Sequence, residues 1–147
     1  MAEPPNPTVA LFHYTNDPSA QRSSTLDFQI GFMENICGSN NSNTARLDSG
    51  DICVIASFEY NRWLVIIGMI EGRLECSDIW KKRGGRIWKH NYKFNPLCLP
   101  FVVMKNHKDG AFIKHCNEAG LPWYKCLNSG FHGYRNEYYP ILKKMFQ

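Results

Sequence analysis

Aromatic and basic side chains alternate over residues 80–94, a combination typical of nucleic-acid-binding surfaces. A protein that binds an unpaired base needs flat side chains that stack on the base and cations that hold the flanking phosphates. Two tryptophans, Trp80 and Trp88, supply the rings. The stretch therefore predicts a nucleic-acid site with cations at the phosphates. These cations are Lys81, Lys82, Arg83, Arg86 and Lys89.

The same rings also have a structural interpretation as core side chains. Residues 87–94 alternate as a strand does, which places an aromatic face toward the core and a basic or polar face toward solvent. The aromatic face consists of Trp88, His90, Tyr92 and Phe94. Trp80 differs, because charged residues flank it in a loop predicted over 79–85. We therefore expect Trp80 outside the core, where a base can stack on it.

Histidine and cysteine cluster late in the chain, but without the spacing of a metal site. The cluster consists of His107, His115, Cys116, Cys126 and His132. Two ligands of one tetrahedral zinc ion usually come from a C-x-x-C or an H-x₃₋₅-H pair, and neither pattern occurs. Structural thiols and surface histidines are the better interpretation. We expect no metal and no other cofactor.

Catalysis has one open alternative, a small metal-independent ribonuclease. One histidine of a pair would take the 2′-hydroxyl proton while the other protonates the leaving oxygen, with a lysine nearby. His13 and His132 are the candidates, but any chain with five histidines permits such a pair. The phosphate-binding patterns G-x-x-x-x-G-K-[ST] and G-x-G-x-x-G are absent. An enzyme is therefore less expected than a binding module, and a protein-interaction adaptor is the third alternative.

The composition fits one ordinary globular domain. The chain has 147 residues, of which 44% are hydrophobic and 20% charged, and its net charge of +4 mildly favours anionic partners. Six cysteines follow no tight pattern and no charged-then-apolar leader opens the sequence, so we expect reduced thiols in an intracellular protein, cytoplasmic or nuclear. No apolar run is long enough for a membrane span. Residues 1–7 predict a flexible, proline-rich leader before a single domain over 8–147.

The elements that must position these residues are mostly strands. A central hairpin is predicted, with strands over 52–58 and 63–70 joined by the polar residues 59–62. A helix is favoured over 23–37, although this stretch also alternates as a strand would. The connections are too tight for a parallel sheet, so we predict an α+β, strand-dominated fold: a small curved sheet or β-barrel with flanking helices. Further strands are expected over 8–14, 71–78, 87–94 and 99–104, a loop over 38–43, one helical turn over 112–117 and a terminal helix from residue 139.

Four stretches carry a resemblance to a known superfamily: VALFHYTND, SGDICVIAS, WLVIIGMIEG and DIWKKRGGRIWKHNYKF. In this order they resemble the PUA-like superfamily, and within it the EVE and YTH domains, over most of residues 8–104. In those families a Gly-Asp pair opens a central strand and a glycine in the next strand allows close packing; the matching residues are Gly50, Asp51 and Gly68. The resemblance implies a small β-barrel that binds RNA or DNA and receives one modified or flipped base in an aromatic-lined pocket.

The resemblance also implies which residues line that pocket. The end of the opening strand matches the pocket wall, Ser57 matches a small polar position, and Trp80 matches the aromatic residue of a loop. Phosphate contacts from the basic residues after Trp80 complete the predicted site. The wall residues are His13, Tyr14, Thr15 and Asn16.

Overall fold

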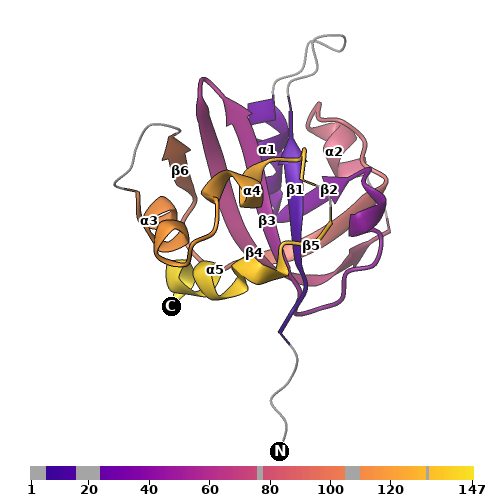
Figure 1. Ribbon diagram of the computed structural model, residues 1–147. Coiled ribbons are helices and arrows are strands. Elements are labelled where there is room, and N and C mark those ends of the chain that lie inside the picture. The colour runs from indigo at the N-terminus through magenta and orange to yellow at the C-terminus, as the bar shows by residue number, and fades with distance from the viewer. Residues whose placement is uncertain (1–5, 16–23, 76–77, 105–109, 132) are drawn as a thin grey trace, which may run out of the picture.

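The computed structural model describes residues 6–15, 24–75, 78–104, 110–131 and 133–147. Three residues named above, Asn16, His107 and His132, lie outside these ranges, as does most of the predicted leader. The central element is a curled, half-barrel sheet (Figure 1). This confirms the α+β, strand-rich fold with a small curved sheet.

The sheet has six strands, and its order differs from the order along the chain. Hydrogen-bonded neighbours run β1-β3-β4-β5-β2, with β6 beside β4. The curl brings the two outer strands near each other. The backbone N–H of Gly38 in β2 donates to the Tyr14 hydroxyl of β1 over 3.2 Å. We call this open side of the half-barrel, between β1 and β2, the seam. The strands are β1 (Val9–Tyr14), β2 (Ile36–Ser39), β3 (Ile52–Glu59), β4 (Arg62–Leu74), β5 (His90–Pro96) and β6 (Phe101–Met104).

The predicted central hairpin is confirmed as β3 and β4. Tyr60 and Asn61 connect the strands with φ angles of 56° and 59°. Two successive positive φ values match the right-handed twist of the flanking strands, as in a type I′ turn. β4 runs on to Leu74, with a register shift between Ile70 and Gly72. This irregularity lets one long strand pair with β3 and β6 at its start and with β5 at its end.

The prediction that excluded parallel pairing was wrong for one pair of strands. β1 lies parallel to β3, with Val9 opposite Ile52 and Tyr14 opposite Ser57. A parallel pair needs a crossover of a dozen residues or more, usually with a helix. Residues 15–51 supply it, because they contain the favoured helix, which is α1 (Ser24–Glu34). Every other strand pair in the sheet is antiparallel.

Both faces of the sheet are buried. One face packs against three C-terminal helices, of which α4 crosses in front of β1 and β3 in Figure 1. The other face packs against α1 and α2, which fill the inside of the curl. Burial on both faces explains why β3 reads as a continuous apolar run instead of an alternating one. The remaining helices are α2 (Asp78–Lys82), α3 (Ala111–Glu118), α4 (Trp123–Leu127), which the sequence did not predict, and the expected α5 (Tyr139–Phe146).

Gly68 permits the close approach of β4 to β5, and we expect Gly68→Ala to destabilise the fold. A Cβ atom at this position would lie 2.4 Å from Cδ2 of Phe94 and 3.0 Å from Sγ of Cys53. Overpacking of this kind costs about 2 kcal/mol in the free energy of unfolding, which urea denaturation measures. Gly72→Ala in the same strand is the control, because its Cβ would have no atom within 4 Å. Equal losses in the two variants would contradict this account.

Candidate nucleic-acid interface

Trp80 is part of the core, so the expectation that it lies outside was wrong. The predicted basic loop begins with the short helix α2, which directs Trp80 inward and Lys81 and Lys82 to solvent. The Trp80 side chain is 0% exposed, and its Nε1–H donates to Oδ1 of Asn91 over 2.8 Å. Its ring also meets the ring of Tyr14 edge-on, with centroids 6.1 Å apart. No face of Trp80 is therefore open to a base.

The predicted pocket residues lie on opposite faces of β1, because consecutive side chains of a strand point to opposite sides. Tyr14 faces the inside of the curl with Trp80, and burial raises the pKa of its hydroxyl. Ser57, opposite Tyr14 in β3, is equally buried, and its Oγ has no hydrogen-bond partner among the described residues. His13 faces the other way, and Thr15 is exposed. These residues therefore do not form one pocket.

Among the described residues, the predicted phosphate contacts separate into cations with an ion-pair partner and cations without one. Lys81, Lys82 and Lys89 are exposed. Arg83 forms an ion pair with Glu34, and the two side chains are 50% and 21% exposed. Arg86 is the most constrained of the five cations, because it is tied into a polar network at the start of α1.

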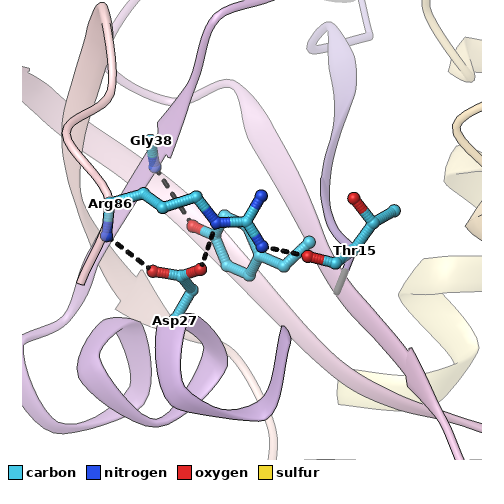
Figure 2. A network of polar contacts seen from close by, with 5 residues as sticks. Thr15, Asp27, Gly38 and Arg86 are labelled. Atoms are coloured by element: carbon cyan, nitrogen blue, oxygen red, sulfur yellow. Dashed lines mark hydrogen bonds and ion pairs between the residues drawn. The ribbon is translucent and has the colours of Figure 1, made fainter. Parts of the chain in front are cut away.

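Arg86 joins Asp27 and Thr15 in that network (Figure 2). Asp27 is its buried anion. Its carboxylate is 1% exposed and accepts two hydrogen bonds from Arg86, from the backbone N–H over 3.1 Å and from Nε over 3.0 Å. The guanidinium of Arg86 also donates to the carbonyl oxygen of Thr15, at the end of β1. Arg86 thus ties the segment before β5 to α1 through Asp27 and to the end of β1 through Thr15, so its main role is structural.

A polar pocket of about 200 Å³ opens at the seam. One wall comes from β1, a second from the end of β2 and the residues after it, and a third from residues 129, 131 and 135. We call it the seam pocket. It is lined by Leu11, His13, Ser39, Asn40, Asn41, Trp88, Ser129, Phe131 and Arg135.

Trp88 is half-buried and forms the aromatic wall of the seam pocket. Its ring lies against Tyr14, with centroids 5.3 Å apart, and the Arg86 guanidinium carbon lies 5.4 Å from the centre of its ring. Only glycine fits beneath it, because a Cβ on Gly38 would lie 2.6 Å from Cβ of Trp88. The sequence favoured a core position for Trp88, and the structure places it at the edge of that core.

Arg135 carries a buried charge with no carboxylate partner among the residues that the structure describes. Its side chain is 7% exposed and donates to the carbonyl oxygens of Asn128 (3.0 Å), Phe131 and Gly133. These bonds shape the loop that forms the third wall. Its Nε atom is buried and has no partner in the described part of the chain, and burial lowers the pKa of the guanidinium. Buried polar groups nearly always have a partner, so ordered water or a ligand is expected here.

His13 is held neutral. Burial, and secondarily the positive charge of Arg135, lowers its pKa from 6.5 to about 4. Its Nδ1 atom is buried and has no hydrogen-bond partner among the residues that the structure describes. A neutral imidazole can accept a proton but is a poor general acid at neutral pH. His13 could therefore supply only one half of the ribonuclease mechanism, and its proposed partner His132 lies outside the described residues.

The low pKa of His13 predicts a loss of stability on mild acidification. Because the folded-state pKa lies below the unfolded value of 6.5, the unfolded chain binds the proton first as pH falls. The contribution of His13 to the free energy of unfolding is complete above pH 6.5 and declines as the pH falls toward the folded pKa of about 4. Between about pH 7 and about pH 5 the free energy of unfolding should fall by about 2 kcal/mol. Denaturation at both pH values should show this difference in the wild type. In His13→Gln the difference should shrink by that amount, and an unchanged difference would refute the assignment.

Sequence reasoning missed Arg135, Asn40, Ser129 and Phe131, which no motif marks. The described cysteines, residues 37, 53, 98, 116 and 126, are free thiols. In the same parts of the chain, no three His, Cys, Asp or Glu side chains gather as metal ligands. None of the helices found there has the length and apolar character needed to cross a membrane. No protein-family model, curated protein or solved structure matches this chain.

Proposed function

We propose that the protein binds single-stranded nucleic acid, RNA or DNA, and receives one unpaired or flipped base, modified or unmodified, in the seam pocket. The pocket has the two features that such a site needs. Trp88 and Phe131 provide aromatic surface, and asparagine and serine side chains around them provide hydrogen-bonding groups. Its volume of about 200 Å³ suits one ring system better than a large ligand.

One observation carries the proposal. Six buried side-chain atoms lack a hydrogen-bond partner in the described chain, and three of them belong to residues of the seam pocket. These atoms are Nδ1 of His13, Nε1 of Trp88 and Nε of Arg135. Each unsatisfied buried group costs about 1–3 kcal/mol, so three around one pocket favour an occupant that supplies partners after a small side-chain adjustment.

The charges around the pocket support a polyanion. Arg135 places an uncompensated positive charge at the pocket wall, and Lys89 is exposed directly after Trp88. Lys81 and Lys82 add exposed charge on α2. We assign phosphate contacts to the three lysines, and not to Arg83 and Arg86, whose ion pairs compete with a phosphate.

Titration of labelled single-stranded RNA and DNA, followed by fluorescence anisotropy, tests the proposal. Wild-type affinity should fall steeply as salt is raised. Trp88→Ala, checked for folding by circular dichroism, should weaken binding about tenfold or more, because one stacked base contributes about 1–3 kcal/mol.

Paired lysine variants provide the control for this experiment. Lys89→Ala should weaken binding and reduce its salt dependence, whereas Lys144→Ala, an equally exposed lysine on α5, should leave both unchanged. Equal affinity of the wild type and a folded Trp88→Ala for every oligonucleotide would exclude the seam pocket as the base site.

A further inference from the structure

The outer edge of β1 carries backbone groups that the sheet does not use. In a parallel pair, the backbone N–H and C=O groups of every second residue point toward the neighbouring strand. This series begins at Thr8, which lies just before β1 and whose carbonyl accepts from Ile52 N–H over 2.8 Å. The residues between them turn their N–H and C=O groups away from β3. Val9 is the first of these, and its N–H donates to Oδ1 of Asn136 over 2.8 Å while its carbonyl accepts from Arg135 N–H over 2.9 Å.

Leu11 and His13 are the next residues with outward-facing backbone groups. No described residue bonds to the outward N–H or C=O of either one. The side chains of β1, in contrast, are mostly buried. Both residues line the seam pocket. Unpaired edge groups are ready hydrogen-bonding sites, so the pocket offers a donor and an acceptor from rigid backbone in addition to its side chains.

The free edge is short and closed at both ends. At one end, Asn136 and Arg135 form hydrogen bonds with the backbone N–H and C=O of Val9. At the other end, the Gly38 N–H donates to the Tyr14 hydroxyl across the seam. A peptide that adds a strand needs a longer run of edge groups. Two outward residues fit a single planar group with adjacent donor and acceptor atoms.

We infer that the free edge of β1 at Leu11 and His13 reads the Watson–Crick edge of the bound base. This inference rests on the proposed function and names how the same pocket recognises its ligand. Every nucleobase carries a hydrogen-bond donor next to an acceptor on that edge, so the Leu11 carbonyl and the His13 N–H can each find a partner. Only a base freed from its complementary strand presents this edge, and a methyl group on its ring nitrogen blocks it.

The ligand side of the test uses matched methylated oligonucleotides. Each unmodified single strand is compared with one carrying N1-methyladenine, N3-methylcytosine, N1-methylguanine or N3-methyluracil, and with 5-methyluracil, which carries its methyl away from the Watson–Crick edge. For the base that binds best, ring-nitrogen methylation should weaken binding about tenfold or more, as loss of a bidentate base contact does. The 5-methyl group should not produce this loss.

The protein side uses two variants of one residue. His13→Pro removes the backbone N–H. Proline is tolerated at this position, because the N–H of His13 points away from β3 on an edge strand. His13→Ala keeps the N–H and removes only the imidazole. Discrimination against the methylated base should be lost in His13→Pro and kept in His13→Ala, with both variants shown to be folded.

The outcomes separate this inference from the proposed function. If the wild type binds oligonucleotides but does not distinguish the methylated bases, the edge-reading inference is wrong and the proposed function stands. If folded wild type binds none of the unmodified or methylated strands, both are wrong.

Discussion

Trp80→Ala is expected to lower the free energy of unfolding by about 4 kcal/mol, as large-to-small substitutions of buried aromatic residues do. Trp80 is fully buried, and its removal leaves a cavity between α1, α2 and the curled sheet. It also leaves Oδ1 of Asn91 without the indole donor that it now has at 2.8 Å. The substitution should therefore affect the whole domain and not a single binding contact.

Chemical denaturation of Trp80→Ala and Trp80→Phe measures this effect. The phenylalanine variant keeps most of the volume but loses the indole N–H, so its loss should be smaller and should report mainly the bond to Asn91. Trp88→Ala is the comparison, because Trp88 is only half-buried and should cost less stability while affecting binding more. If Trp80→Ala retained full stability and lost binding, Trp80 would be the stacking residue after all.

The sequence predicted the scaffold well because the scaffold has local signals. The apolar run of β3, the turn at Tyr60 and Asn61, and the proline at the start of α5 each specify one element through nearby residues. The parallel pairing of β1 with β3 was not predicted, because it depends on the path of α1 through space. Hydrophobic periodicity gives the type of an element but not the neighbour with which it pairs.

Trp80 was misplaced because its burial depends on distant residues. Its neighbours along the chain are charged, and the helix that turns it inward has only five residues, too few for a periodic pattern. The residues that it contacts include Tyr14, more than sixty positions earlier, and Asn91 on β5. A short segment with a mixed pattern does not reveal such contacts.

The seam pocket could not be predicted from the sequence, because it also depends on residues far apart in the chain. It exists because the sheet curls and because the loop before α5 returns to β1, where Arg135 N–H bonds to the Val9 carbonyl. His13 was selected for its side-chain chemistry, and the free backbone edge beside it has no sequence signature. Of the predicted pocket residues that the structure describes, His13 alone lines the seam pocket. Trp88, for which the sequence favoured a core position, lines it too.

Asp27→Asn is expected to cost about 3 kcal/mol, because removing one partner of a buried ion pair leaves the other charge uncompensated. Asp27 is 1% exposed and Arg86 20%, so water replaces little of the lost interaction. Glu34→Gln is a matched control, since it breaks the more exposed ion pair with Arg83 and should cost about 1 kcal/mol or less. Urea denaturation of the two variants gives both values, and equal losses would contradict a special role for Asp27.

The double variant Asp27→Leu with Arg86→Leu separates the charge effect from the positioning effect. Replacing both members of a buried pair by apolar side chains is often neutral or stabilising, so the double variant should regain much of the stability lost in Asp27→Asn. Its oligonucleotide binding should be weaker than that of the wild type, because the guanidinium that packs on Trp88 and bonds to the Thr15 carbonyl is gone. Wild-type stability together with wild-type binding would mean that the network of Figure 2 contributes only to stability and that the position of Trp88 does not depend on Arg86.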